Sequence, residues 1–438
     1  MARSAISVNG IRGVSGDIRI FAARAELKRR SSKDVVYDGH DSPAVPGAYS
    51  SGAVADAPDH TVNEPNRGRL RCLHCDRRLP ALWQFACPNC GGQLALDGTD
   101  GATPVSSLHA GNTPLYQLQV GASAFLYLKD EGRNPTGSFK DRAMGAAVAA
   151  ALTMGARGVS LYSCGNGGAA AAAAAAGLGL RCLVLALPTM SSQAAALIRA
   201  YGAQVLTLDL DHDTLWTSGA VGRLQEQLWQ NGGWFPLNRI ALPLRASPYY
   251  LAGCASLAGE LLSQIAGGPG ALVVPTGSGD LLLGLWLALR DGPQPPRLVA
   301  VQARGAAPLV RAWRRGAQRV DVLPGAQTVA SGIEMVTGSD DALAAVYASQ
   351  GSAIAVSDAD ILAMRGKLAR EHGLLTSPEG AAAAVVGTRL LGKEGHAHPV
   401  VAVLTAAGSK YPQFDPVASL ATPTPVNAAQ VLKIVGNA

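Results

Sequence analysis

The chain has 438 residues, of which 48% are hydrophobic and 16% charged. That length allows two or three domains, and that composition is typical of a compact globular protein rather than a disordered one. The formal net charge of +6 arises in residues 1–33, which hold eight of the 37 basic residues and two of the 31 acidic ones, so the remaining chain has 29 of each. A neutral body argues against nucleic-acid binding, and no apolar run is long enough to predict a membrane span.

The first 66 residues show no sustained hydrophobic period, and residues 42–66 are rich in Pro, Gly, Ala and Asp, as in a linker. We predict a disordered basic extension over residues 1–66 and a short tail over residues 421–438. An organellar transit peptide is an alternative interpretation of the basic, acid-poor start. Because no secretory signal precedes the cysteines, the expected compartment is the reducing cytoplasm.

Two Cys-x-x-Cys pairs follow, in the segment RCLHCDRRLPALWQFACPNCGGQL. Cys72 and Cys75 form the first pair, and Cys87 and Cys90 form the second after eleven intervening residues. Two such turns can aim four thiolates at one ion in tetrahedral geometry. The sequence therefore predicts a zinc ribbon over residues 67–98 with a structural rather than catalytic zinc. A metal-free ribbon and a redox pair are the alternatives.

Beyond residue 111, short apolar runs alternate with helix-like stretches. The runs AFLYLKD, GVSLYSC, RCLVLAL, QVLTLDL, ALVVP, RLVAVQA and PVVAVL predict strands, and alanine- and leucine-rich stretches between them predict helices. Strands that alternate with helices indicate an α/β fold with doubly wound parallel sheets, which bind ligands at the carboxyl ends of their strands.

Three glycine-rich turns follow strands: SCGNGG at 163–168, PTGSGD at 275–280 and TAAGS at 405–409. Backbone N–H groups in such turns can hold an anion. None of the turns matches the G-x-x-x-x-G-K-[ST] loop, and no G-x-G-x-x-G opens a first βαβ unit. The turns therefore favour a small ligand with one phosphate over a nucleotide.

The stretch KDEGRNPTGSFKDRAM at 129–144, together with the asparagine turn and the TGSG turn, resembles the threonine synthase branch of the fold-type II, tryptophan synthase β-like, pyridoxal-phosphate-dependent enzymes. The Cys-x-x-Cys ribbon, GNTPL at 111–115 and SPEGAAA at 377–383 extend the resemblance over about residues 71–411. It implies two doubly wound parallel-sheet domains: a large one from residues 99–145 and 250–420, and a small one from residues 146–249. It also implies pyridoxal 5′-phosphate as cofactor, a small amino-acid substrate and a homodimer.

The resemblance also implies roles for individual residues. Lys140 matches the Schiff-base lysine, Asn166 the partner of the pyridoxal 3′ oxygen, and Thr405 the hydroxyl that faces the ring nitrogen. The phosphate cradle would be Thr276, Gly277, Ser278 and Gly279, and donors for the substrate carboxylate would be Ser163, Gly165 and Gly167. The structural alternatives are a solvated lysine, a left-handed turn at Asn166, an ordinary strand–helix turn at 276–279 and a simple cap at Thr405.

The substrate is less constrained than the cofactor. In SPYYLAG at 247–253, Tyr250 stands where the family has an arginine, and a tyrosine offers one neutral donor instead of a charged fork for a substrate phosphate. Arg133 and Arg245 are candidates for a compensating charge. We expect a threonine-synthase-like lyase that eliminates or replaces a β or γ substituent of an amino acid. The alternatives are a threonine or serine dehydratase or ammonia-lyase, a β-replacement synthase acting on an O-activated serine and, remotely, a non-catalytic zinc-ribbon binding protein.

Overall fold

The computed structural model describes residues 20–21, 69–81, 83–97, 108–122, 124–392 and 398–414. The predicted tail over 421–438, and all but two residues of the predicted extension over 1–66, lie outside these ranges. Within them, no helix is both long and apolar enough to cross a membrane.

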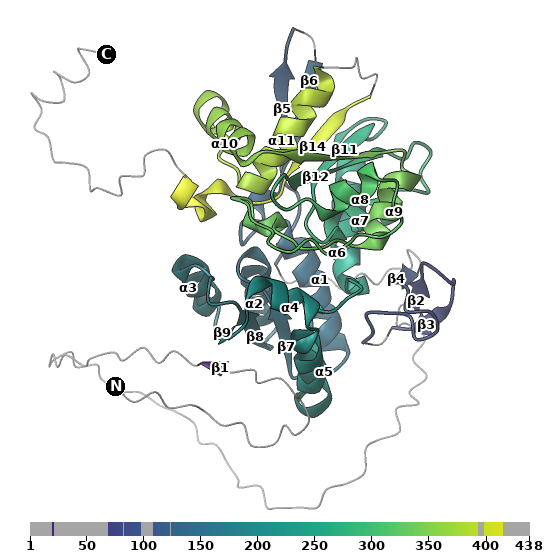
Figure 1. Cartoon of the computed structure of the whole chain (residues 1–438), viewed down its shortest axis with the longest axis vertical. Helices are drawn as coiled ribbons and strands as arrows, with labels where there is room; N and C mark the ends of the chain where they lie inside the picture. Colours follow the sequence, from purple (N-terminus) through teal and green to yellow (C-terminus); the bar gives the residue numbers. More distant parts are fainter. Residues whose placement is uncertain are drawn as a thin grey trace, which may run out of the picture.

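The larger half of the molecule is built on a six-stranded sheet with the order β13-β12-β11-β14-β6-β5 (Figure 1). All neighbours pair in parallel except β5 and β6, which form an antiparallel hairpin. The strands are β5 (Leu115–Val120), β6 (Ala124–Asp130), β11 (Ala271–Pro275), β12 (Arg297–Ala303), β13 (Ser352–Val356) and β14 (Val400–Leu404).

Helices cover both faces of this sheet. Alternate residues of one strand face opposite layers, since Val273 packs with α11 while Leu272 and Val274 pack with α6, α7 and α9. Burial on both faces explains why β11 and β14 read as unbroken apolar runs. The helices of this half are α6 (Pro248–Gln264), α7 (Asp280–Leu289), α8 (Pro308–Arg314), α9 (Asp340–Ala348), α10 (Asp358–His372) and α11 (Pro378–Leu391), with short 3₁₀ turns η1 (Glu131–Arg133), η2 (Ser331–Ile333), η3 (Gly408–Lys410) and η4 (Pro412–Phe414).

The smaller half contains a five-stranded sheet, β1-β9-β8-β7-β10, parallel except for β1 against β9. Its strands are β1 (Ile20–Phe21), β7 (Gly158–Tyr162), β8 (Arg181–Ala186), β9 (Gln204–Leu208) and β10 (Trp234–Pro236), and its helices are α2 (Asn166–Gly177), α3 (Ser192–Ala200), α4 (His212–Thr217) and α5 (Ala220–Gly232). The alanines at 169–175 of α2 are buried, since their small side chains let the helix lie close to the sheet. Helix α1 (Lys140–Thr153) packs against α2 and α6 and so joins the two halves.

The cysteine-rich segment forms a third, three-stranded antiparallel sheet, β3-β2-β4, from β2 (Arg69–Cys72), β3 (Arg78–Pro80) and β4 (Leu94–Asp97). It docks on the body through polar contacts near the start of α6. The side chain of Gln93 donates to the carbonyl of Ala246 and accepts from its N–H, at 2.8 and 2.9 Å. His74 Nε2 lies 2.6 Å from Asp341. The ribbon is therefore fixed to the segment that leads into α6 and to the start of α9.

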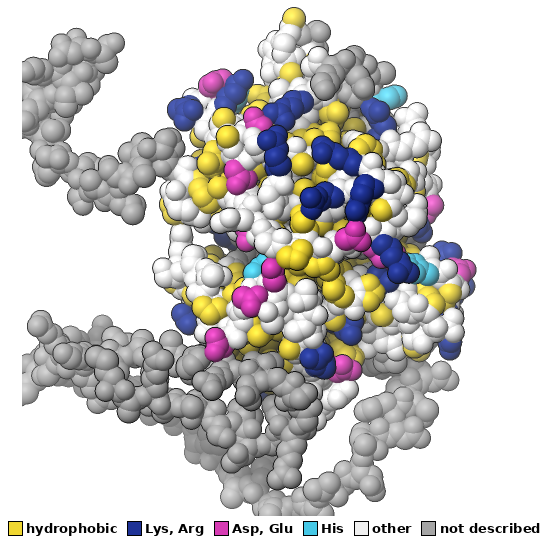
Figure 2. Space-filling model, viewed as in Figure 1, with side chains coloured by type: hydrophobic (Ala, Val, Ile, Leu, Met, Phe, Trp, Pro, Cys, Tyr) yellow, Lys and Arg dark blue, Asp and Glu magenta, His cyan; other side chains and the backbone are white. Residues whose placement is uncertain are grey.

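The predicted α/β class with parallel sheets is confirmed. On the face shown in Figure 2, Lys and Arg side chains gather over the half that contains the six-stranded sheet, with acidic side chains scattered among them. Basic side chains are therefore unevenly distributed over the surface, although the chain beyond residue 33 has equal numbers of basic and acidic residues.

Candidate active site

A cavity of about 810 Å³ lies between the two halves. Its walls include residues 163–167 after β7, residues 276–280 after β11 and Thr405 after β14. These segments lie at the carboxyl ends of parallel strands, as predicted for the ligand site of such a sheet. The three glycine-rich turns therefore meet at one cavity although they are far apart in the chain.

Lys140 is the first residue of α1 and lines this cavity. The turn before it is bonded to the end of β14, since the N–H of Phe139 donates to the carbonyl of Thr405 at 3.0 Å. The Nζ atom of Lys140 donates to the hydroxyl of Tyr250 at 2.5 Å. Burial lowers the pKa of Lys140, and the charges of Asp280 and Cys254 oppose that effect. A lysine with a lowered pKa is more often a neutral amine, the nucleophilic form.

The loop Thr276–Gly279 leads into α7. Gly279 has φ +104°, and a Cβ there would lie 2.3 Å from that of Ala342, so only glycine fits. No acceptor among the described residues pairs with the N–H groups of Gly277, Ser278 and Gly279. Unpaired N–H groups at a helix N-terminus are suited to a phosphate.

Asp280 follows this loop at the first position of α7 and also lines the cavity. Burial raises the pKa of its carboxyl group, while the charge of Lys140 and a hydrogen bond with Ser278 lower it. An ionised carboxylate here would repel a phosphate, whereas a protonated one would be a donor.

The residues predicted to bind the substrate carboxylate lie in the turn between β7 and α2 and at the start of α2. The hydroxyl of Ser163 accepts from the N–H of Gly168 at 2.8 Å and of Gly165 at 3.3 Å, so this side chain holds the turn in shape. Gly167 lines the cavity beside Ser163. Asn166 also lines the cavity, and its Nδ2 donates to the hydroxyl of Tyr411 at 2.9 Å.

Two cavity residues were not predicted individually. Tyr411 follows η3, and burial followed by the charge of Glu379 raises the pKa of its hydroxyl. Glu379 Oε1 accepts from the N–H of Gly332 at 2.7 Å, whereas its buried Oε2 has no partner among the described residues. The motif SPEGAAA, which predicts a helix start, is the sequence signal that contains Glu379.

The two arginines considered for a compensating charge have other partners. Arg133 pairs with Asp130, is 59% exposed and lies outside the cavity lining. Arg245 lines the cavity, but its Nε donates to the carbonyl of Gly91 in the ribbon and one terminal nitrogen donates to Asp341. Arg239 also lines the cavity, and no described residue forms a hydrogen bond or ion pair with it.

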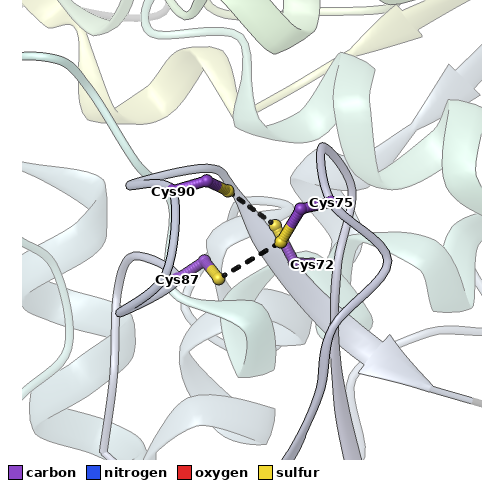
Figure 3. A group of neighbouring side chains, drawn as sticks. All are labelled: Cys72, Cys75, Cys87 and Cys90. Atoms are coloured by element: carbon purple, nitrogen blue, oxygen red, sulfur yellow. Dashed lines mark hydrogen bonds between the residues drawn. The ribbon is translucent and has the colours of Figure 1, made fainter.

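The four predicted ribbon cysteines form one cluster (Figure 3). Their sulfur atoms all lie within 4.8 Å of one another, with Cys72 and Cys90 3.5 Å apart and Cys75 and Cys87 3.7 Å apart. Two thiolates bound at about 2.3 Å to one tetrahedral ion lie about 3.8 Å apart. These separations are too long for a disulfide and fit a tetrahedral four-thiolate zinc site. The four cysteines complete the shell of such an ion, which leaves no position for a substrate.

Comparison with known proteins agrees with this cavity. Residues 106–406 match the family model described as pyridoxal-phosphate dependent enzyme. The chain belongs to this family. Lys140 at the start of α1 and the loop of residues 276–279 both line the cavity that would hold the cofactor of such an enzyme.

Relatives of this pyridoxal-phosphate-dependent enzyme include threonine synthases. That of Methanocaldococcus jannaschii is 31% identical over 327 residues, covering 70% of this chain and 77% of the relative. That of Methanosarcina acetivorans is 32% identical over 374 residues, covering 78% and 88%. The resemblance to the threonine synthase branch is thereby confirmed.

Solved structures of similar fold include a T.th. threonine deaminase, with 26% identity, a TM-score of 0.56 and coverage of 67% of this chain and 92% of that one. Maize serine racemase has 19% identity, a TM-score of 0.58 and coverage of 74% and 92%. The second likeness concerns the fold alone.

The cavity of this family member fits pyridoxal phosphate. Lys140 would hold the aldehyde, the N–H groups of residues 277–279 would hold the phosphate, and Thr405 would face the ring nitrogen. A neutral hydroxyl at the ring nitrogen does not stabilise a full positive charge there, which suits elimination and replacement better than transamination.

Proposed function

We propose that this pyridoxal-phosphate-dependent enzyme removes or replaces a β or γ substituent of an amino acid, as a threonine-synthase-like lyase. The observation that supports this most is that the half-buried amine of Lys140 and the unpaired N–H groups of residues 277–279 line one cavity. We also propose one structural zinc per chain at the four cysteines and a homodimer.

The residues have distinct tasks in this proposal. The cofactor, when bound, supplies an aldehyde for the substrate amine and a conjugated ring that stabilises negative charge at Cα. The amine of Lys140 would act as the base that takes the α-proton of the substrate. Ser163 fixes the turn whose N–H groups, at Gly165 and Gly167, would orient the substrate carboxylate, and Asn166 would donate to the pyridoxal 3′ oxygen. Orientation places the Cα–H bond toward Lys140, which favours its cleavage over decarboxylation.

The substrate is a second question within the same function. The threonine synthases named above are relatives, and O-phosphohomoserine is the substrate that such a relationship suggests. A specific feature favours a dehydratase or ammonia-lyase instead. Tyr250, a neutral group, contacts Lys140 at the position where the family has an arginine for the substrate phosphate.

The decisive experiment compares the wild type with Lys140→Ala. The wild type should show visible absorbance from the lysine-bound cofactor, and Lys140→Ala should lose it. Lys367→Ala, on the exposed side of α10, is the matched control and should retain it. A wild type without this absorbance would contradict the cofactor assignment.

Substrate tests follow on the same protein. O-phosphohomoserine, O-phosphoserine, threonine and serine are offered in turn, and release of phosphate and ammonia is measured. Phosphate release with threonine formed from O-phosphohomoserine would support the synthase reaction, and ammonia from threonine or serine would support the dehydratase. Bound cofactor without turnover of any of these amino acids would contradict the proposed lyase and support the alternative of a non-catalytic zinc-ribbon binding protein.

A further inference from the structure

The amine of Lys140 forms a hydrogen bond with the side chain of Tyr250. Its hydroxyl accepts from Nζ at 2.5 Å, and the amine lies 5.1 Å from the centre of the ring. The side chain is 4% exposed and lines the cavity. Tyr250 is therefore in contact with a reacting atom and is open to whatever occupies the cavity.

The surroundings of Tyr250 keep its hydroxyl protonated. Burial raises its pKa well above 10, and the charges of Cys254 and Asp280 act in the same direction. These are the titratable groups that face the Lys140–Tyr250 pair, Cys254 from the next turn of α6 and Asp280 from the start of α7. A neutral phenol beside an amine can pass a proton in either direction.

We propose that Tyr250 is a catalytic acid that donates its phenolic proton to the leaving group of a β-hydroxy amino acid. The proposal rests on the proposed function, because it needs Lys140 to act as the base. The leaving group at this site would then be the unactivated β-hydroxyl of the substrate and not a phosphate ester.

The proton balance closes within the pair. Lys140 takes the α-proton, and the electrons of the Cα–H bond form the Cα=Cβ bond while the Cβ–O bond breaks with its electron pair on oxygen. The phenol of Tyr250 protonates that oxygen, so water leaves. The Lys140 ammonium then returns its proton to the Tyr250 phenolate, which it stabilises at hydrogen-bond distance. No further reactant is needed.

The chemistry of leaving groups explains why a tyrosine is useful here. Hydroxide is a poor leaving group and needs a proton, whereas phosphate and chloride leave as stable anions. An arginine at this position would hold a phosphate by charge, but its guanidinium does not release a proton to a leaving group. Compared with an arginine, a tyrosine at position 250 therefore binds a phosphate less well but can donate a proton.

The test uses two substrates that differ only in the leaving group. Serine must lose hydroxide, and β-chloroalanine loses chloride, while both give pyruvate and ammonia. Tyr250→Phe should lower kcat for serine about 100-fold or more, with KM little changed, and lower kcat for β-chloroalanine less than about threefold. Tyr249→Phe is the matched control, a neighbouring buried tyrosine outside the cavity lining, and should affect both substrates equally and little.

Two outcomes would overturn the proposal. Equal losses on serine and β-chloroalanine would assign Tyr250 a structural role and leave the proposed function intact. A wild type that binds the cofactor but converts neither substrate would refute β-elimination at this site, and the role of Tyr250 with it.

A measurement without turnover checks the contact. In cofactor-free protein, the rate of acetylation of Lys140 by acetic anhydride is followed against pH by peptide mass spectrometry. Because the Tyr250 oxygen accepts from the ammonium form, Tyr250→Phe should lower the pKa of Lys140 by about half to one pH unit. An unchanged pKa would contradict the contact.

Discussion

Replacing Glu260 by glutamine should destabilise the protein by about 3–5 kcal/mol at neutral pH, and the loss should shrink in acid. Glu260, on α6, pairs with Lys129 and with Arg142, whose guanidinium lies 2.7 Å from its carboxylate. It also accepts from the N–H groups of Asn112 and Thr113, at 3.1 and 2.6 Å. The side chains of Lys129 and Arg142 are 0% and 3% exposed, so losing this carboxylate leaves two buried cations short of a partner.

The magnitude and sign follow from the titration of Glu260. Burial raises its pKa, but hydrogen bonds and charges from Lys129 and Arg142 outweigh burial and bring it from 4.5 to about 2. A shift of that size corresponds to about 3 kcal/mol, and the side chain is only 12% exposed, so solvent screens little of it. Because the folded-state pKa lies below the unfolded one, this stability is present above pH 4.5 and is lost as the pH falls toward 2.

The assay is urea unfolding of wild type and Glu260→Gln at pH 7 and pH 3.5. The difference in unfolding free energy between them should be smaller at pH 3.5 by about 1.5 kcal/mol, since titration of the other carboxyl groups cancels in the comparison. Glu371→Gln is the control, because Glu371 is 59% exposed and its ion pair with Lys367 is long, at 4.0 Å. It should change stability by less than about 0.5 kcal/mol at either pH. Equal costs for the two variants, or a pH-independent difference, would refute this reasoning.

Two further predictions concern the metal and the cofactor phosphate. Purified protein should contain about one zinc per chain by elemental analysis, and Cys87→Ser should lose it; protein refolded with zinc that retains none would contradict the assignment. Asp280→Asn should bind pyridoxine 5′-phosphate, which lacks the aldehyde, about three- to tenfold more tightly than wild type at pH 9, and this gain should shrink as the pH is lowered, measured by titration calorimetry. Burial raises the pKa of Asp280, so its repulsion of the phosphate develops as the pH rises, and equal affinities at pH 9 would contradict this.

The main strands and the glycine turns could be predicted because their signals are local. Strands β6 and β12 have the predicted bounds, since each has an apolar stretch of four or five residues next to polar ones, AFLYL before Lys129 and LVAV between Arg297 and Gln302. Strands β10 and β13 were not predicted. β10 has three residues and β13 is only partly buried, so neither gives an apolar run that stands out from its neighbours.

The cavity could be predicted in its parts but not in its contacts. That three turns would meet follows from parallel topology, which brings the carboxyl ends of strands to one edge. The hydrogen bond from Lys140 to Tyr250 joins residues 110 positions apart, and the bond from Asn166 to Tyr411 spans 245. Such pairs depend on how α6 and η3 pack, which no short motif encodes. For the same reason the sequence could not indicate whether Arg245 faces the cavity or the ribbon.

The position of Arg245 connects the zinc ribbon with the choice of substrate. Its guanidinium donates to the carbonyls of Gly91 and Leu244 and to the carboxylate of Asp341. Few of its N–H groups therefore remain to bind a substrate phosphate. The bond to Gly91, next to Cys90, also means that an intact ribbon keeps Arg245 in this arrangement. With an arginine absent at position 250 and Arg245 engaged, Arg239 is the arginine of the described cavity lining that is free to meet an anion. One arginine suffices for a carboxylate, whereas a dianionic phosphate is usually held by several charged or N–H donors. The charges of the cavity therefore favour an amino acid without a phosphate, the same class that proton donation by Tyr250 would serve.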